Sequence, residues 1–203
     1  MAIERGGTWG GNGGLPADGV VVADDAAARA VVTAARRAGE PIPPLGLLGG
    51  DLCRTLGGRG DPDRLRSDAA TRVTVDLAAV LLDGRVHWFV AHLVAHRPWW
   101  RGRVFAALNA QWMGAWNAAP RAHPGDGRLE TFDATMGLGD RVKARSRLRD
   151  GSHLPHPDIV YRRTAATQVD LDPATPVWLD GDRVGPARAL SVRVEPDALQ
   201  VVV

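Results

Sequence analysis

The sequence predicts an α+β fold, in which a short α/β segment precedes a β-sandwich-like domain. Residues 20–58 alternate short apolar runs with helix-forming stretches, which is the order of a strand–helix–strand–helix unit. From residue 71 onward, β-branched and aromatic residues dominate, as is typical of strands. Asp-Gly pairs recur between the apolar runs, and both residues tolerate the positive φ angles of tight hairpins. We place the boundary near residue 60, which gives segments 1–60 and 61–203.

The first segment opens with a Gly-rich stretch that predicts a loose arm. The expected elements, in order, are an arm, a strand, a helix, a strand and a helix over residues 1–19, 20–23, 26–38, 45–48 and 52–56. Asp24 and Asp25 precede the first helix and Asp51 precedes the second. Carboxylates are favoured there because they cap free backbone N–H groups and complement the helix dipole. A metal ion bound by Asp24 and Asp25 is the alternative reading of that pair.

The second segment consists mainly of predicted strands. They are expected over residues 73–82, 86–94, 104–112, 129–136, 177–179, 190–194 and 199–203. Asp83-Gly84 and Asp180-Gly181 each stand between two apolar runs and predict hairpins. Residues 138–148 predict a short basic helix. The result is a β-rich, sandwich-like second half.

Composition excludes several classes of protein. The chain has 203 residues, and its 25 basic and 23 acidic residues leave a net charge of only +2, so we expect no nucleic-acid binding. No apolar run reaches the roughly 18 residues of a membrane span, so no transmembrane segment is expected. Cys53 is the only cysteine, which excludes an intramolecular disulfide. The N-terminus lacks the apolar core of a secretory signal, so we expect a cytoplasmic protein.

Two sets of side chains raise the question of a binding site. His87, His92 and His96 are spaced unlike the histidines of zinc motifs, so we expect no zinc site. The second half is rich in tryptophan, which can fill a core or line an apolar cleft. The candidate cleft residues are Trp99, Trp100, Trp112 and Trp116. Such a cleft would take an apolar small molecule or a partner protein.

Several motifs of the second half resemble those of the bacterial diacylglycerol kinase and related lipid kinase family, which shares a superfamily with NAD kinases. Residues 108–130 are similar to its "ANG…GGG" strand followed by "PxAxxxDGxLD", and residues 151–157 to its "GxHxxxP". Residues 178–185 look like its "xxDGE" hairpin. Upstream, residues 44–57 resemble a shortened "PLGxxPxGTGNDFARxLG". The resemblance covers roughly residues 20–90 and 104–203, and it implies the lipid kinase type of fold.

The resemblance implies transfer of a phosphoryl group from ATP, with Mg²⁺, to a lipid-like or other apolar alcohol. The family's "GGDGT" phosphate loop is degenerate here, because Asp24 and Asp25 stand where glycines belong. Its "GTGND" loop is shortened to Gly49-Gly50-Asp51. We expect ATP at these two loops if the chain is a kinase. The alternatives are a non-catalytic, pseudokinase-like binding module that uses neither ATP nor Mg²⁺, or an enzyme repurposed for another apolar metabolite.

Two acidic positions carry the implied chemistry. Asp182 matches the family's general base, and Asp126 matches its metal-binding carboxylate, with backbone carbonyls at His123 and Arg128 as further ligands. Both aspartates also have a simpler explanation, because each lies in an Asp-Gly turn. A shortened α/β half would leave sheet edges uncovered. We therefore expect either a homodimer or a partner chain that completes the missing half.

Overall fold

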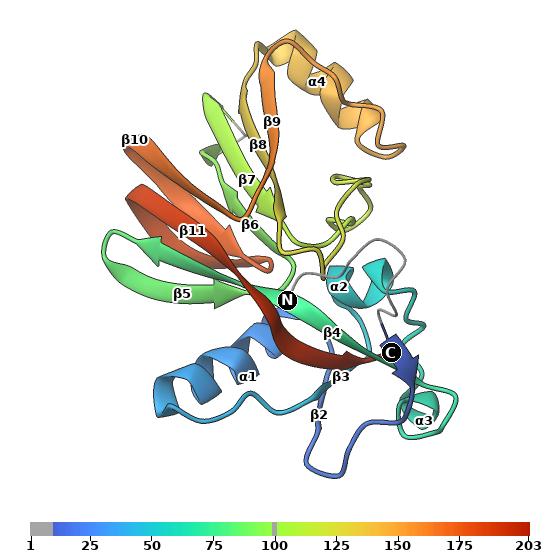
Figure 1. Cartoon of the computed structure of the whole chain (residues 1–203). Coiled ribbons are helices and arrows are strands. Elements are labelled where there is room, and N and C mark those ends of the chain that lie inside the picture. The colour runs from blue at the N-terminus through green and yellow to red at the C-terminus, as the bar shows by residue number, and fades with distance from the viewer. Residues whose placement is uncertain (1–9, 99–100) are drawn as a thin grey trace.

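The computed structural model describes residues 10–98 and 101–203. Its helices are α1 (Asp25–Ala38), α2 (Gly50–Thr55), α3 (Pro62–Leu65) and α4 (Leu138–Arg147). Its strands are β1 (Gly10–Asn12), β2 (Val20–Val22), β3 (Leu45–Leu47), β4 (Thr71–Leu82), β5 (Arg85–Phe89), β6 (His92–Ala95), β7 (Arg103–Leu108), β8 (Leu129–Thr135), β9 (Ile159–Thr164), β10 (Ala166–Leu179) and β11 (Asp182–Val202). Figure 1 shows α1, β2 and β3 at one end of the molecule and α4 with β8 and β9 at the other. The α+β fold predicted from the sequence is confirmed.

The first part of the chain forms the predicted strand–helix–strand–helix unit. β2 and β3 pair in parallel, with Val20 opposite Leu45, and α1 connects them. α1 buries Ala28, Val32 and Ala35 along one stripe, which is the spacing that brings side chains to one helix face. β3 also pairs in parallel with the end of β11. The last strand of the chain therefore closes the sheet begun by the first strands.

Two long strands run through both parts of the molecule. β4 pairs antiparallel with β11 from Leu190↔Leu82 to Val202↔Arg72, with a register shift between Glu195 and Leu199. At this shift Asp197 has φ 53°, and its amide donates to Asp76 Oδ1 at 3.1 Å. The bulge bends β11, so one half of the strand lies in the sandwich-like part and the other half joins β3.

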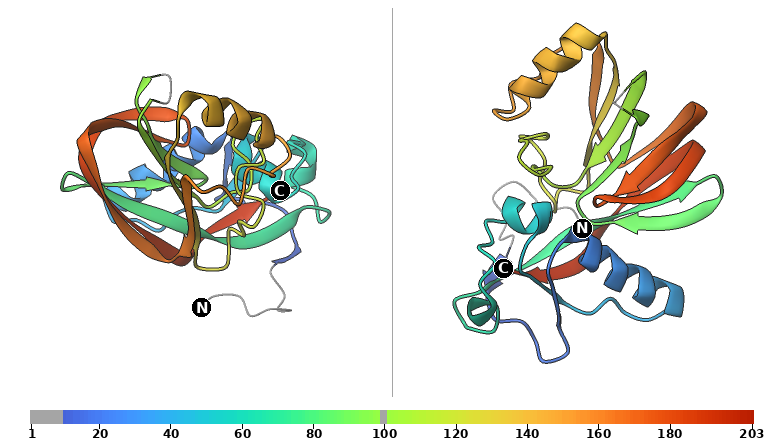
Figure 2. Two further views of the ribbon diagram at one scale, coloured as in Figure 1. Left: turned by 90° about the horizontal axis from the view of Figure 1, so that it is seen from above. Right: turned by 180° about the vertical axis from the view of Figure 1, so that it is seen from behind.

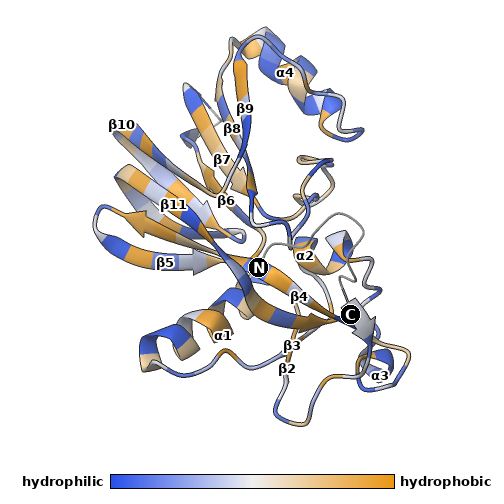
Figure 3. Cartoon of the chain, viewed as in Figure 1, coloured by the Kyte–Doolittle hydropathy of each residue, from blue (hydrophilic) through white to orange (hydrophobic). Residues whose placement is uncertain are grey.

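The sandwich-like part is a continuous, curved antiparallel sheet. β5 pairs with β4, and the order then runs β4–β11–β10–β6–β7–β8–β9. Figure 2 shows this sheet curling around the space between β10, β11 and β7. A core cluster that includes Phe89, Leu93 and Leu179 fills that space. Figure 3 shows hydrophobic and hydrophilic residues alternating along β10 and β11, as expected of strands with one face buried.

Several predicted boundaries differ from the structure. The predicted strand over residues 104–112 ends at Leu108, because the chain turns there to reach the loop before β8. The two predicted strands over 190–194 and 199–203 form the single strand β11, since a bulge interrupts the ladder without ending it. Part of the predicted arm forms β1, which pairs with β4.

The hairpin predictions are confirmed at two of the Asp-Gly pairs. Asp83-Gly84 joins β4 to β5 and Asp180-Gly181 joins β10 to β11, and all four residues have positive φ. Asp126-Gly127 lies in the loop before β8 instead of between two paired strands. No helix among residues 10–98 and 101–203 has the length and apolar character to cross a membrane. The boundary near residue 60 stays a prediction, as does the cytoplasmic location.

The core position Phe89 provides a test of this packing. Phe89 is fully buried on β5, whereas Val86 on the same strand is 50% exposed. Replacing Phe89 by Ala removes a large side chain and leaves a cavity, which should lower the free energy of unfolding by about 3–5 kcal/mol. Val86→Ala should change it by no more than about 1 kcal/mol. Urea unfolding of both variants measures the difference, and equal losses would place Phe89 outside the core.

Candidate functional site

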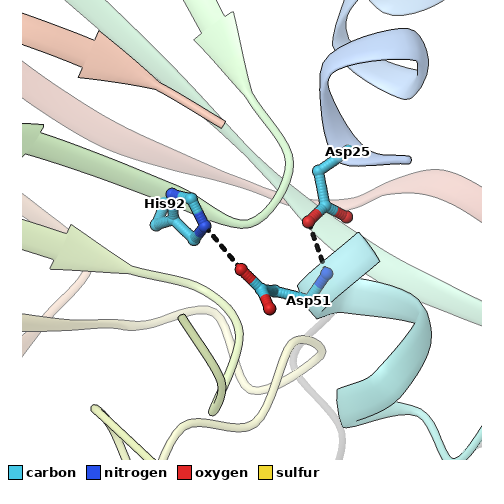
Figure 4. Close-up of side chains that lie close together, drawn as sticks. All are labelled: Asp25, Asp51 and His92. Atoms are coloured by element: carbon cyan, nitrogen blue, oxygen red, sulfur yellow. Dashed lines mark hydrogen bonds and ion pairs between the residues drawn. The ribbon is translucent and has the colours of Figure 1, made fainter. Parts of the chain in front are cut away.

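Three side chains from separate elements meet where the α/β unit joins the curved sheet. They are Asp25 at the start of α1, Asp51 in α2 and His92 at the start of β6 (Figure 4). His92 Nε2 lies 2.9 Å from Asp51 Oδ2. The Asp51 amide donates to Asp25 Oδ2 at 2.5 Å. One potential ligand atom from each residue lies within 4.8 Å of the other two. We call Asp25, Asp51 and His92 the carboxylate–histidine cluster.

Local sequence sets the direction of the two aspartates. Asp24 is the N-cap of α1 and accepts from the Ala27 amide at 2.8 Å, which confirms the capping interpretation for that residue. Asp25 instead points to α2, where its carboxylate accepts from the amides of Asp51 and of Leu52, the latter at 3.2 Å. Two amides in the first turn of α2, those of Asp51 and Leu52, are therefore occupied and not available to bind an anion.

Glycines permit this close approach of α1 and α2. Gly50 has φ 92°, and a Cβ atom placed on it would collide with the Asp25 carboxylate. Gly49 is the N-cap of α2, with extended backbone angles. The expectation that Asp51 caps this helix is wrong, because Asp51 lies one residue inside α2 and its carboxylate turns away. That carboxylate accepts from the Gly114 amide at 2.9 Å.

Burial and neighbouring charges shift the pKa values of the cluster. Burial raises the pKa of Asp25 to about 7, assisted by the charge of Asp180. Burial alone would lower the pKa of His92, but its hydrogen bond to Asp51 and the nearby carboxylates raise it overall. Burial alone would raise the pKa of Asp51, but His92 and the Gly114 amide lower it overall. The cluster therefore contains the Asp25 carboxyl group, which takes up a proton near neutral pH, beside the Asp51–His92 pair, which favours its charged form.

Asp180 lies next to the cluster and holds the backbone around His92. Its side chain is fully buried and accepts from the amides of Val90, Ala91 and His92 at 3.0, 2.9 and 3.0 Å. Burial raises the pKa of Asp180, although His92 and these amides oppose the rise. Because these donors lie in the connection between β5 and β6 and at the first residue of β6, Asp180 fixes the backbone that carries His92.

The predicted base, Asp182, lies at the edge of this site. Arg29 of α1 links it to the interior, since Arg29 Nη2 is 2.5 Å from Asp182 Oδ2 and Arg29 Nε is 3.8 Å from Asp180 Oδ2. The Asp182 side chain is 62% exposed. The structure thus places Asp182 on the Asp180 side of the carboxylate–histidine cluster, and its role as a base stays a prediction.

The predicted metal residues Asp126, His123 and Arg128 form one turn that is separate from the cluster. The Arg128 amide donates to Asp126 Oδ1 at 3.0 Å, and the His123 carbonyl accepts from the Asp126 amide. Arg163 pairs with Asp126, and its Nε lies 2.7 Å from Glu130 Oε1. A guanidinium group therefore already neutralises this turn, and metal binding there stays a prediction.

The predicted tryptophan cleft falls partly outside the described residues, since Trp99 and Trp100 lie between the two described ranges 10–98 and 101–203. The Arg54 guanidinium carbon lies 3.5 Å from the centre of the Trp112 ring, a stacked cation–π arrangement. Trp116 packs against a small core cluster with Leu108 and Ala118. Neither Trp112 nor Trp116 lines the pocket of about 500 Å³ between β8, β9 and the loop before β9.

Sequence patterns missed two residues of this site. The spacing of His92 matches no zinc motif, and in the sequence the predicted hairpin alone accounts for Asp180. The run of apolar residues before His92 and the apolar strand before Asp180 are consistent with burial. They do not show that the two residues meet. No pattern in the sequence indicated that Arg29 would pair with Asp182.

Two carboxylates and one imidazole form a reasonable donor set for a divalent cation. Carboxylate oxygens suit Mg²⁺ and Mn²⁺, whereas an imidazole nitrogen favours transition metals over Mg²⁺. The same groups can also exchange protons near neutral pH. The site therefore presents the carboxylates of Asp25 and Asp51. A phosphate-binding loop would present backbone amide donors instead.

Comparison with known proteins relates this fold to kinases. The sequence profile of the YegS C-terminal NAD kinase beta sandwich-like domain matches residues 70–203. No curated protein sequence matches the chain. Among solved structures, two that are described as a diacylglycerol kinase from Bacillus anthracis str. Sterne are similar to it. The first has a TM-score of 0.62 at 14% sequence identity, and the second has a TM-score of 0.63 at 13%. Each match covers 91% of this chain and 77% of the chain in the solved structure.

A third structure, of a diacylglycerol kinase from the same organism, has a TM-score of 0.57 at 15% identity. That match covers 91% of this chain and 75% of the other. Similarities at this level of identity establish a shared fold. They extend over both the α/β unit and the curved sheet, whereas the family profile covers the sheet and not the first three helices.

The raised pKa of Asp25 predicts how stability depends on pH. The unfolded carboxyl has a pKa near 3.8 and the folded one near 7, so between pH 4 and 7 the folded protein keeps a proton that the unfolded chain loses. Stability should therefore fall as pH rises through this window, by up to about 4 kcal/mol from Asp25, and then level off. His92 contributes in the same direction and Asp51 in the opposite one.

Asp25→Asn isolates this contribution, since the amide oxygen can still accept from α2. In urea unfolding with a chelator present, the variant should match the wild type near pH 4 and be more stable at pH 8. Asp24→Asn is the matched control, because Asn also caps helices well and Asp24 is exposed; it should keep the wild-type slope. A slope unchanged by Asp25→Asn would contradict the raised pKa.

Proposed function

Because the chain belongs to the family with the YegS C-terminal NAD kinase beta sandwich-like domain, we propose that it is a lipid kinase-like phosphotransferase. Its reaction would move the γ-phosphoryl group of ATP to the hydroxyl of a lipid-like or other apolar alcohol. One observation carries the proposal: the carboxylate–histidine cluster lies at the junction between the α/β unit and the curved sheet, beside Asp180 and Asp182. Phosphoryl transfer needs mainly positioning and compensation of charge.

A divalent cation fits the residues of the cluster. Asp25, Asp51 and His92 would hold it, and when bound it would neutralise the phosphate oxygens of the nucleotide. The cation is essential to the proposal, because the Asp25 carboxylate occupies the Asp51 and Leu52 amides in the first turn of α2. Without positive charge, a triphosphate would meet Asp25, Asp51 and Asp180 with repulsion.

The chain's own residues divide the remaining tasks. Asp180 holds the backbone of Val90, Ala91 and His92 and so fixes the imidazole. Arg29 holds the exposed Asp182 carboxylate against the α/β unit. Asp182 would accept the proton of the attacking hydroxyl. Arg54, stacked on Trp112 near Asp51, could face the nucleotide phosphates from the other side.

The hydrogen bonds from the first turn of α2 to Asp25 also favour a second function, that of a binding module without catalysis. Because Asp25 already accepts from the Asp51 and Leu52 amides, these donors need no nucleotide phosphate. In this case the chain would bind an apolar molecule or a protein partner and leave ATP unused. Measurement of metal and nucleotide binding separates the two functions.

Pairing through a sheet edge is a further proposal for the partner. Each of β2, β5 and β9 has one paired neighbour in the described part of the sheet, so each offers a free edge. Val160 on β9 is 52% exposed, and Val20 and Val21 on β2 are 37% and 40% exposed. A homodimer or a partner chain could cover these residues. Analytical ultracentrifugation of the purified chain would detect the homodimer.

The cation site predicts a strict order of binding. In calorimetry, the protein should bind Mn²⁺ more tightly than Mg²⁺ because of His92, and ATP should bind only when one of them is present. Asp51→Asn removes a carboxylate ligand. It should weaken Mn²⁺ binding at least about tenfold, because losing even a residue that only supports a metal ligand costs that much. Asp24→Asn should bind like the wild type. Failure to bind either cation at millimolar concentration would favour the binding module.

The assignment of the base predicts a loss of turnover without a loss of stability. Asp182→Asn should abolish transfer of labelled phosphate from ATP to diacylglycerol in detergent micelles. It should shift Tm by less than about 4 °C, because an exposed ion pair contributes about 0–1 kcal/mol. Asp68→Asn, another exposed aspartate, should retain full turnover. Transfer at the wild-type rate in Asp182→Asn would assign the base to another residue.

A further inference from the structure

Arg29 lies at the border of the carboxylate–histidine cluster. It follows Asp25 by four residues in α1, so the two side chains share one face of the helix, one turn apart. Arg29 Nε lies 3.8 Å from Asp180 Oδ2, and Arg29 Nη2 lies 2.5 Å from Asp182 Oδ2. Asp180 is in turn close enough to Asp25 for its charge to raise the pKa of Asp25. Arg29 therefore places a permanent positive charge beside the cluster.

The hydrogen bonds of this guanidinium group are incomplete. The Arg29 side chain is only 16% exposed, and its buried Nε has no hydrogen-bond partner among residues 10–98 and 101–203. Asp180 does not supply one, because 3.8 Å exceeds the length of a hydrogen bond and its oxygens already accept from three backbone amides. Since buried polar groups are normally satisfied, Arg29 Nε is a donor available to a further acceptor.

The carboxylate that Arg29 does contact is exposed to solvent. The Asp182 side chain is 62% exposed, and ion pairs of exposed groups contribute little because water and salt screen them. The hydrogen bond to Asp182 comes from Arg29 Nη2. A phosphate group has oxygens for two parallel N–H···O bonds, so it can accept from Nε and Nη2 together. Phosphate therefore satisfies the donor that Asp182 leaves unpaired.

A second ion pair of α1 provides a comparison. Arg36, two turns after Arg29, pairs with Glu195 of β11. These two side chains are 35% and 22% exposed, and Glu195 also lies 3.8 Å from Arg193. No nitrogen of Arg36 is both buried and unpaired. Both pairs join α1 to β11, but only Arg29 combines a buried, unpaired donor with a position beside the cluster.

We propose that Arg29 binds a phosphate group of the nucleotide and exchanges the Asp182 carboxylate for it. Without nucleotide, Arg29 holds Asp182. When a polyphosphate binds at the cluster, the guanidinium group turns Nε and Nη2 to a phosphate, and the Asp182 oxygen that it contacted becomes available to the hydroxyl of a substrate. This inference rests on the proposed phosphotransferase function and adds the regulation of its site, because the base is released only when phosphate is present.

Calorimetry at saturating Mn²⁺, with inorganic tripolyphosphate and with ATP, measures the role of Arg29. Arg29→Gln should bind both ligands about tenfold or more weakly than the wild type, as expected for a lost hydrogen bond to a charged group. Both should be affected alike, because Arg29 contacts phosphate. Mn²⁺ alone should bind this variant at least as tightly as the wild type, since the cluster is intact and a nearby positive charge is gone.

Arg36→Gln is the matched control, because it removes the other ion pair between α1 and β11. It should bind tripolyphosphate and ATP like the wild type. Arg29→Lys keeps the charge but not the paired N–H groups, so its affinity should lie between those of Arg29→Gln and the wild type. Arg29→Lys also replaces Arg29→Gln in these titrations if the latter does not fold.

Competition between phosphate and Asp182 gives a readout that a merely structural Arg29 would not produce. Asp182→Asn leaves Arg29 without its carboxylate partner, so this variant should bind tripolyphosphate about two- to fivefold more tightly than the wild type. Loss of a negative charge could tighten anion binding by itself, so the substitution is repeated in Arg29→Gln. There it should change the affinity by less than about twofold, because the two residues are coupled.

The outcomes separate this inference from the proposed function. If the wild type binds neither ATP nor tripolyphosphate with Mn²⁺, both are overturned. If the wild type binds them and Arg29→Gln binds them equally well, only the role of Arg29 is overturned. Equal tightening by Asp182→Asn with and without Arg29, or no tightening in either case, would contradict the exchange.

Discussion

The pairing of β4 with β11 is the constraint on which the rest of the structure depends. These strands belong to both the α/β unit and the curved sheet, and a bulge at residues 196–198 sets the bend between them. The buried Asp76 carboxylate fixes that bend by accepting from the amides of Asp197 and Gly127. Burial raises the pKa of Asp76 against the effect of these amides. The same residue therefore positions the β11 bulge and the loop that leads to β8.

The candidate site lies at this junction because the ends of several strands meet there. Asp25 follows β2, Asp51 follows β3, and His92 begins β6 beneath the hairpin of Asp180. Loops at strand ends commonly carry binding groups on a rigid sheet. Here the carboxylates replace the amide donors expected of a phosphate loop, so the polarity of the site is reversed. Any anionic substrate would need a cation, which is why metal binding decides between the two proposed functions.

One loop joins the cluster to the cavity beside β8 and β9. The Gly114 amide contacts Asp51, and Ala119, further along the same segment, lines the cavity beside Phe132 and Tyr161. The two places differ in character, since the cluster is charged, whereas apolar side chains form much of the wall of the cavity between β8, β9 and the loop before β9. Gln111 ties the loop to α2 through the Thr55 hydroxyl. The loop thus offers a physical connection between a charged site and an apolar one.

The sequence by itself determined the local features. Apolar runs and helix formers predicted β2, α1, β3 and α2, Asp-Gly pairs predicted the β4–β5 and β10–β11 hairpins, and Asp24 was placed at a helix cap. These features depend on neighbours in the chain. Only the tertiary structure decided which distant side chains meet. Asp25, Asp51 and His92 are brought together by parallel pairing and a bulged strand, and the Arg163 that pairs with Asp126 comes from β9. No local spacing encodes such contacts, because burial and electrostatics act through space.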